Sequence, residues 1–298
     1  MNSTLLTQLN SVSKFANGSK WNRFISNPIK YCIAISSRFI HQKEGKLYST
    51  KTFWGQAFTV QLPASTDIYL SGGKTHESEL RLCRYWIKHI QPEDILIDIG
   101  AHFGFFTSLF SLLAPAGKIF SFEASKKNYA LLQQNVQSLN NVTIHHQAMS
   151  KDDTPMYFYE FPVVYSEYNS MNKTQYEKET WYATNKPIEI KVDSTTLDLF
   201  YTSQNIIPRF IKMDVEGGEY DVIQGGIHLF KNQDVILAME YLENSRGNEN
   251  HRLAAELLMQ LGYQSFAINQ EGELEFIRSI DAYLQKNNFE SDNIIFKK

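Results

Sequence analysis

Two apolar runs, each ending near an acid, constrain the fold of this chain more than any other feature of its sequence. The first, Ile-Leu-Ile-Asp-Ile-Gly-Ala-His-Phe-Gly, occupies residues 95–104, and the second, Ile-Phe-Ser-Phe-Glu, occupies residues 119–123 after a helical pattern. Gly100 and Gly104 let the backbone turn tightly and approach a ligand. Glu123, at the tip of the second run, can accept both hydroxyls of a ribose. The pattern predicts that a nucleoside-bearing cofactor binds at the carboxyl edge of a parallel sheet.

Strands and helices alternate regularly from residue 94 onward. The predicted strands are 94–99, 118–122, 142–147, 209–213 and 234–240. Further predicted elements are a short strand region at 50–71, a helix at 77–90, strands at 155–161 and 187–193, helices near 217–230 and 250–261, and an antiparallel end. This alternation predicts an α/β fold, with a mostly parallel sheet and helices on both faces. We expect an N-terminal extension over 1–76 and a cofactor-binding domain over 77–298, with an aromatic-rich insertion near 161–186.

The composition excludes several classes of protein. Of the 298 residues, 43% are hydrophobic and 20% are charged, which is typical of a soluble globular protein. The net charge of −3 argues against a nucleic-acid-binding protein, which usually carries a basic face. Cys32 and Cys83 give neither a disulfide framework nor the spacing of a metal site. Since no segment has the pattern of a signal peptide or the roughly 18 apolar residues of a membrane span, we expect a cytoplasmic protein.

The N-terminal segment carries a charge opposite to that of the rest of the chain. Residues 1–66 contain eight Lys or Arg and one acid, Glu44, so this segment carries +7, and the total of −3 leaves −10 for the remainder. Asn27 and Pro28 predict the start of a helix. One face of this helix would carry Ile29, Cys32, Ile33, Ser36 and Ile40. The helix is predicted either to pack on the domain or to bring residues 14–46 onto an anionic membrane or a partner, peripherally at the inner membrane surface.

Three motifs in a fixed order carry a family resemblance. They are residues 97–104, residues 122–124 (Phe-Glu-Ala) and residues 211–219 (Ile-Lys-Met-Asp-Val-Glu-Gly-Gly-Glu). Over roughly residues 77–242, the chain therefore resembles the FkbM-type family of S-adenosylmethionine-dependent methyltransferases. The resemblance implies a class I methyltransferase fold, which is a Rossmann-like, seven-stranded sheet with an antiparallel last strand. A nicotinamide enzyme is the rival interpretation, but the dinucleotide fingerprint requires a third glycine that the first motif lacks.

The resemblance also implies which residues contact the cofactor. Asp98, Gly100, Ala101 and Gly104 would line the methionine and ribose portion, and Glu123, beside Ala124, would hold the ribose hydroxyls. Ala148 and Met149 would border the adenine, Glu79 would lie near the amino end, and Asp214 would lie near the methyl group. His102 stands where the family commonly has Asn, and its side chain is expected either to hydrogen-bond near the cofactor or to pack in the loop.

Two acids are placed where they can assist transfer of a methyl group to a hydroxyl. Asp214 and Glu240 end neighbouring strands, so their carboxylates are expected to face one cleft and to act either as a general base or as ligands of Mg²⁺. The usual third ligand of such a metal site is missing, because Tyr241 follows Glu240. His251 is a further candidate base. Glu219, His145 and His146 are expected to be structural.

The acceptor is expected to meet aromatic and polar side chains. Tyr165, Tyr168 and Trp181 can stack on sugar faces, while Asn169 and Asn172 can bind hydroxyls. Further candidate contacts are Glu216, Tyr241 and a polar lid at 243–250. Family members mostly methylate hydroxyls, often on sugars or glycosylated natural products, so a sugar or glycoconjugate O-methyltransferase is the leading prediction. The alternatives are a methyltransferase acting on a small non-sugar or lipid-linked metabolite, and a non-catalytic cofactor-binding partner protein.

Overall fold

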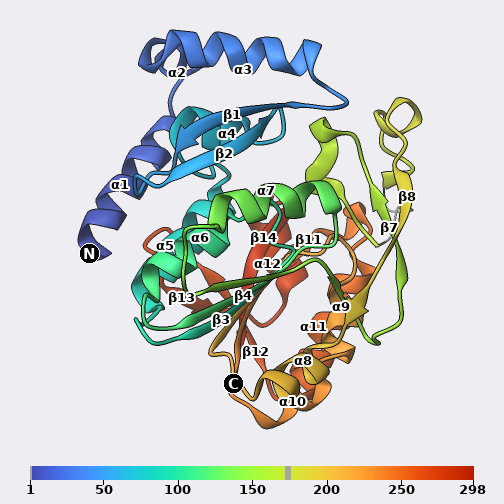
Figure 1. Ribbon diagram of the computed structural model, residues 1–298. Coiled ribbons are helices and arrows are strands. Elements are labelled where there is room, and N and C mark those ends of the chain that lie inside the picture. The colour runs from blue at the N-terminus through green and yellow to red at the C-terminus, as the bar shows by residue number, and fades with distance from the viewer. Residues whose placement is uncertain (1, 172–175) are drawn as a thin grey trace.

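The carboxyl ends of five parallel strands form the edge above which the candidate site lies in the computed structural model, which describes residues 2–171 and 176–298. The main sheet has the order β13-β12-β14-β11-β10-β3-β4-β5 (Figure 1). Its strands are β3 (Ile95–Ile99), β4 (Lys118–Phe122), β5 (Val142–His145), β10 (Phe210–Met213), β11 (Ile236–Leu242), β12 (Gln264–Ile268), β13 (Leu274–Phe276) and β14 (Ser291–Lys297).

The strand directions confirm the expected fold class. Strands β5, β4, β3, β10 and β11 pair in parallel, and β14 is inserted antiparallel between β11 and β12. This is the arrangement expected for the class I methyltransferase fold. The sheet has an eighth strand in addition to the seven expected, because β13 pairs antiparallel with β12 at the edge.

Two hydrophobic layers cover the two faces of the sheet. Successive side chains of a strand point to opposite faces, so Leu96 belongs to one layer and Ile97 to the other. The Leu96 layer includes α5 (Glu77–His89), α6 (Phe105–Leu113) and part of α7 (Lys126–Val136). The Ile97 layer includes α8 (Leu197–Gln204), α9 (Glu219–Gln224), α10 (Ile227–Asn232), α11 (Glu249–Gln260) and α12 (Ile280–Asn287).

The helix predicted near 217–230 is interrupted. It forms two short helices, α9 and α10, on either side of Gly225 and Gly226. A Cβ atom at Gly225 would lie 2.0 Å from the backbone oxygen of Ser150, so a side chain there would collide with the neighbouring loop. The chain therefore approaches that loop closely at the position where the helix breaks.

Part of the N-terminal extension belongs to the main core. It contains α1 (Asn2–Ala16), α2 (Lys20–Ser26), α3 (Pro28–Ile40), β1 (Lys46–Lys51), β2 (Ala57–Leu62) and α4 (Thr66–Ser71). Leu5, Leu9 and Val12 of α1 are buried in the same cluster as α5. The extension and the domain, divided in the prediction between residues 76 and 77, therefore share one core.

The predicted strand around residues 68–70 was wrong, because this segment is the helix α4. Asp67 lies in the first turn of α4, and its carboxylate accepts a hydrogen bond from the backbone N–H of Ile68. Gly72 ends the helix in the left-handed conformation with φ of +79°. These end signals outweigh the β-propensity of the apolar residues between them.

Helices α2 and α3 form the outermost layer of the extension, over β1 and β2 (Figure 1). Asn27 caps α3 by accepting a hydrogen bond from the backbone N–H of Lys30, as the sequence predicted. The predicted packing face was wrong for most of its residues, because Ile29, Cys32 and Ile40 are exposed. The inward face instead carries Ala34 and Ser37, the only fully buried residues of α3.

The insertion after β5 forms small paired elements beside the main sheet. They are β6 (Ala148–Met149), β7 (Met156–Glu160), the 3₁₀ helices η1 (Val163–Tyr168) and η3 (Tyr182–Thr184), β8 (Ile188–Val192) and β9 (Ser194–Thr195). Strands β7 and β8 pair antiparallel, as predicted for 155–161 and 187–193. Asn172, a predicted acceptor contact, lies outside the described residues. Among the described residues, no helix is both long and apolar enough to cross a membrane.

Candidate functional site

A cavity of about 1480 Å³ lies above the carboxyl edge of the sheet. Its walls come from the loop after β3, the ends of β4, β10 and β11, the segment around η1, and the loop around η4 (Asn244–Arg246). The predicted polar lid at 243–250 is therefore part of the wall. Single-ligand pockets are commonly about 300–1000 Å³, so this cavity has room for a cofactor together with an acceptor.

The loop after β3 requires left-handed backbone conformations at three of its five residues. Gly100, His102 and Gly104 have φ values of +76°, +51° and +85°. A Cβ atom at Gly100 would lie 1.8 Å from the backbone oxygen of Asp214, so only glycine fits there. Histidine and asparagine tolerate this conformation better than most side chains, which gives a physical reason for either residue at position 102.

His102 fits the packing interpretation of its side chain. Its ring stacks on Phe103 with centroids 3.7 Å apart, and Nε2 lies 3.4 Å from Oγ of Ser166. Burial, followed by the charges of Lys74 and Lys212, lowers the pKa of His102 to about 3. The imidazole is therefore neutral at physiological pH.

Glu123 lies at the end of β4 with its carboxylate against the loop after β3. Oε2 accepts a hydrogen bond from the backbone N–H of His102 at 2.7 Å, and Oε1 accepts one from that of Ser125 at 2.9 Å. The Asn128 side chain also hydrogen-bonds this carboxylate, and because a carboxylate has about four acceptor positions, some acceptor capacity is left for a ligand in the cavity that Glu123 lines. Burial raises the pKa of Glu123 to about 7 although these hydrogen bonds oppose the shift.

Asp98 is fully buried and is not among the residues that line the cavity. Its Oδ2 accepts a hydrogen bond from Oγ1 of Thr107 at 2.6 Å, and its Oδ1 lies 3.7 Å from Nζ of Lys212. The contact of Asp98 with the cofactor stays a prediction, and in this structure its inner partners hold the carboxylate beneath the loop, outside the residues that line the cavity. Its described contacts fit a residue that orients Lys212.

Lys212 connects the buried Asp98 to the cavity. Its Nζ lies 3.3 Å from Oδ2 of Asp214, the first residue after β10. Burial disfavours the charge of Lys212, but Asp214 and Asp98 outweigh that effect and raise its pKa. The ammonium group therefore stays charged beside Asp214 and stabilises a carboxylate there.

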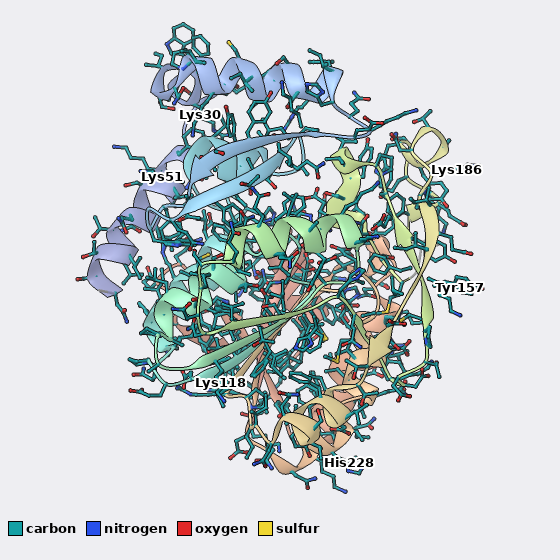
Figure 2. All side chains as sticks on the ribbon, in the orientation of Figure 1. Lys30, Lys51, Lys118, Tyr157, Lys186 and His228 are labelled. Atoms are coloured by element: carbon teal, nitrogen blue, oxygen red, sulfur yellow. The ribbon has the colours of Figure 1, made fainter. Side chains whose placement is uncertain are left out.

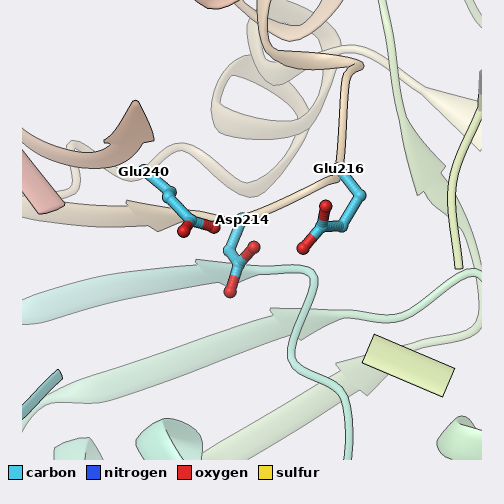
Figure 3. A group of neighbouring side chains, drawn as sticks. All are labelled: Asp214, Glu216 and Glu240. Carbon is cyan, nitrogen blue, oxygen red and sulfur yellow. The ribbon is translucent and has the colours of Figure 1, made fainter. Parts of the chain in front are cut away.

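Three acids converge at this end of the sheet. Asp214, Glu216 and Glu240 each place a carboxylate oxygen within 4.8 Å of the others (Figure 3). The strand register brings two of them together, because Met213 of β10 pairs with Met239 of β11. Glu216 reaches the group from a backbone with φ of +52°, and its Oε2 accepts a hydrogen bond from the Tyr176 hydroxyl at 2.6 Å.

Proximity and burial change the protonation of two of these acids. Burial, together with the charges of Glu240 and Asp214, raises the pKa of Glu216 well above its ordinary value. Burial and the charge of Asp214 raise the pKa of Glu240 to about 8. Both shifts favour the protonated forms of Glu216 and Glu240, while Asp214 has Lys212 as its counter-ion.

The donor set also suits a hard divalent cation. Three carboxylates supply the oxygen ligands that Mg²⁺ prefers. Glu216 provides the third acid that the sequence lacks next to Glu240. The ammonium of Lys212 next to Asp214 opposes a second cation at the same oxygens.

Lys74 and Glu79 form a separate charged pair at the cavity. Nζ of Lys74 is 3.1 Å from Oε1 of Glu79, and both residues line the cavity. Burial opposes the charge of Lys74, but Glu79 and then Asp67 raise its pKa overall. The pair offers one cation and one anion to a zwitterionic ligand.

Several other predicted residues also line the cavity. They are Glu79, Ala124, Ala148, Met149 and Tyr168, in addition to Ala101 and His102 of the loop after β3, Glu123 and the three acids. Gly104 does not line it, because a Cβ atom there would face Leu132 of α7 instead. Lys74 and Lys212 also line the cavity, although the sequence did not single them out as site residues, and so does Tyr176 of the predicted aromatic stretch.

Two predicted residues near β11 lie away from the cavity. His251, the predicted alternative base, is buried with Nε2 3.4 Å from Oε2 of Glu219, which fits the structural interpretation of Glu219. Tyr241 points to the same side, and its hydroxyl lies 3.2 Å from Oδ1 of Asp281. Alternation along β11 explains this, because Tyr241 follows Glu240 and points to the opposite face.

The aromatic insertion contributes two predicted rings, Tyr168 and Tyr176, to the cavity. Tyr165 and Trp181 stack on each other, with centroids 4.0 Å apart and planes at 12°, and neither lines the cavity. Tyr168 stacks behind them at 5.4 Å from Trp181 and does line it. The rings therefore bury one another and form a wall instead of an open stacking surface.

Known proteins resemble this chain over part of its length. A family model described as the methyltransferase FkbM domain matches residues 98–290. Methyltransferase 1 of Beauveria bassiana (strain ARSEF 2860) is 24% identical over 147 residues, which cover 45% of this chain and 59% of that protein. The chain thus spans less than two thirds of that relative.

Solved structures give similar partial alignments. Methyltransferase FkbM from Methylobacillus flagellatus KT aligns with a TM-score of 0.45 and 13% identity, over 79% of this chain and 53% of that chain. Fibrillarin from Aeropyrum pernix, solved with bound S-adenosyl-L-methionine, aligns with a TM-score of 0.41 and 11% identity, over 73% of this chain and 74% of that chain.

Proposed function

This chain belongs to the FkbM family of methyltransferases, and from that premise we propose that it transfers a methyl group from S-adenosylmethionine to a hydroxyl of a sugar or glycoconjugate. The observation that carries the proposal is the charged Asp214–Lys212 pair at the edge of a cavity large enough for two ligands. A carboxylate there is within the same cavity as Glu123, which suits a ribose. The residue proposed to bind the ribose and the charged pair therefore line the same cavity.

The residues of the cavity fit the parts of S-adenosylmethionine. Glu123 has free acceptor positions for the ribose hydroxyls, and Lys74 with Glu79 matches the carboxylate and ammonium of the methionine end. Ala148 and Met149 offer apolar surface to the adenine. The cofactor supplies a methyl group made electrophilic by its sulfonium.

Asp214 is the proposed general base. A sugar hydroxyl is a weak nucleophile at neutral pH, so its proton must leave as the oxygen–carbon bond forms. Asp214 accepts that proton, the hydroxyl oxygen takes the methyl group, and the bond from that methyl group to sulfur breaks. The loop after β3 contacts Asp214 through Gly100 and sets the position of the base relative to the cofactor.

The side chains around the acids favour a polyhydroxylated acceptor. Tyr168, Asn169, Asn244 and Asn250 line the cavity and offer a ring face and amide groups. A screen of the purified protein with S-adenosylmethionine tests this, using nucleotide sugars, free glycosides, lipid-linked glycans and non-sugar phenols or acids. Mass spectrometry should show one added methyl group in a glycoside class. Methylation of non-sugar acceptors alone would contradict the sugar assignment.

Cofactor affinity should rise with pH through about 7. Ribose hydroxyls donate hydrogen bonds to the ionised form of Glu123, whose pKa is raised to about 7, so protonation below that pH competes with binding. Affinity measured by calorimetry is expected to fall by up to about tenfold per unit below pH 7. Glu123→Gln should bind more weakly and remove this dependence, and a wild-type affinity that is flat from about pH 5.5 to pH 8 would contradict the assignment.

Methyl transfer should survive removal of divalent cations. Lys212 already supplies a positive charge to Asp214, and the raised pKa values favour the uncharged forms of Glu216 and Glu240, so the three acids can reach charge balance without a metal. Activity after EDTA treatment and desalting is the measurement. Loss of activity that Mg²⁺ restores would instead assign Asp214, Glu216 and Glu240 as metal ligands.

A further inference from the structure

Helices α2 and α3 expose an apolar surface on the side that faces away from the protein. Their exposed large apolar side chains, which we call the outer face, are Trp21, Ile25, Ile29, Ile35, Phe39 and Ile40. Ile29 and Phe39 are 75% and 77% exposed. A single exposed apolar residue is ordinary, but six on two consecutive helices are not.

On their inward side, the same helices are attached to the rest of the protein by hydrogen bonds from basic side chains. Nζ of Lys30 donates hydrogen bonds to Oγ1 of Thr50 and to the backbone oxygen of Tyr69, both at 3.0 Å. Figure 2 labels Lys30 at the edge of α3 that faces β1. Nε of Arg23 donates to the backbone oxygens of Phe15 and Gly18. Two of the four basic residues of these helices, Arg23 and Lys30, are thus directed inward, while the large apolar side chains of the outer face are exposed.

The surroundings of the outer face are strongly basic. Lys14, Lys20, Arg38, Lys43 and Lys46, which lie within these helices or close to them in the sequence, are exposed, and Glu44 is the one acid before residue 67. Within the described part of the chain, none of these five basic residues forms an ion pair with an acid. The remainder of the protein carries the opposite net charge, so this end of the molecule is attracted to an anionic surface.

We propose that the outer face of α2 and α3 binds the surface of an anionic phospholipid bilayer. A helix that lies in a bilayer interface needs an apolar side directed to the acyl chains and basic groups that reach the headgroups. The apolar side chains of the outer face and the unpaired basic residues supply both. At about 1.5 Å per residue, the thirteen residues of α3 extend for roughly 20 Å along such a surface.

Binding to a bilayer explains the exposed apolar side chains of α3 better than packing against the rest of the protein does. An intramolecular packing surface buries its largest side chains, whereas here the buried residues of α3 are Ala34 and Ser37. Arg38, in the last turn of α3, is both exposed beside the outer face and part of the cavity wall. Membrane contact would therefore bring one wall of the catalytic cavity close to lipid headgroups.

Vesicle sedimentation of the full-length protein tests the proposal without measuring methyl transfer. Wild-type protein should sediment at low salt with vesicles of phosphatidylcholine and phosphatidylglycerol, and should not sediment with phosphatidylcholine alone. High salt should weaken the binding, because screening reduces attraction to the headgroups. No sedimentation with the anionic vesicles would overturn the proposal.

Neutral substitutions separate the apolar contribution from the charge. Ile29→Asn with Phe39→Asn should lower vesicle binding at least tenfold while the net charge is unchanged. Ile207→Asn with Phe276→Asn is the matched control, because these residues are 56% and 57% exposed elsewhere and should leave binding unchanged. Lys20→Gln with Lys43→Gln should weaken binding and reduce its salt dependence.

Two further measurements test for unfolding and for self-association of the protein. The thermal unfolding midpoint should be the same for wild-type and variant proteins, because all the substituted side chains are exposed. Wild-type binding by the variant Ile29→Asn with Phe39→Asn would contradict the proposal. If light scattering shows a dimer that this variant dissociates, and the wild-type protein ignores vesicles, the outer face contacts a second copy of the chain instead.

Discussion

Replacing Asp214 by asparagine should lower kcat by about 100-fold or more, which is a usual contribution of a general base. The change preserves the size of the side chain and an oxygen that can accept from Lys212, but it removes the charge that takes the proton. S-adenosylmethionine affinity should stay within a few-fold of wild type, because Glu123 and Lys74 lie elsewhere in the cavity. Steady-state kinetics and calorimetry on the same preparations measure the two effects.

A matched control distinguishes the role of Asp214 from a general loss of negative charge. Asp221 is also an acid with a lysine partner, since Nζ of Lys151 lies 3.4 Å from its Oδ1, but it does not line the cavity. Asp221→Asn should leave kcat unchanged. If Asp214→Asn keeps full activity, then Asp214 neither takes the proton nor holds a required metal, and both mechanisms are wrong.

Glu123→Ala should weaken S-adenosylmethionine binding by at least tenfold. Hydrogen bonds between a charged group and hydroxyls each contribute roughly 1.5 kcal/mol or more, and about 1.4 kcal/mol corresponds to a factor of ten. The variant also releases the backbone N–H groups of His102 and Ser125, so the loop after β3 loses its anchor. Calorimetry at pH 8, where Glu123 is mostly ionised, gives the largest difference.

Asp94 provides the control for this substitution. It is a carboxylate at the start of β3, where it accepts hydrogen bonds from the backbone N–H of Gln91 and from Arg209. Asp94→Ala should lower the stability of the protein and leave cofactor affinity unchanged, because Asp94 lies at the opposite edge of the sheet. Unchanged affinity in Glu123→Ala would contradict the ribose assignment.

Sequence reasoning recovered the elements that have strong local signals. Strands β3, β4 and β10 are apolar runs that end in glycine or acid, and their order follows from the alternation with helices. Segments with mixed signals were harder to predict. The apolar residues Ile68–Leu70 favoured a strand. The apolar face predicted for α3 was assigned either to packing on the domain or to contact with a membrane or partner, because periodicity identifies an apolar face without saying what covers it.

The residues of the candidate site likewise divide into those that sequence reasoning predicted and those that it did not. Glu123 and Asp214 directly follow strands and Glu240 lies near the end of β11, so topology alone predicted that Asp214 and Glu240 face one cleft and that Glu123 lies at the same edge of the sheet. Glu216 joins them through a left-handed backbone conformation that sequence spacing does not reveal. Lys74 comes from a loop far from the motifs. Tyr165 and Trp181 have the composition of a sugar-binding surface, but their stacking on each other depends on a tertiary arrangement that composition does not encode.

The contact between Gly100 and the backbone of Asp214 has a consequence for how new acceptor preferences can arise in this scaffold. Because both partners are backbone atoms, no change of rotamer relieves a clash, and residue 100 tolerates no side chain. The carboxyl ends of β3 and β10 therefore keep a fixed position relative to each other. Diversification of acceptor choice, whether by natural drift or by engineering, is left to the walls around η1 and η4, where loops surround the same cavity.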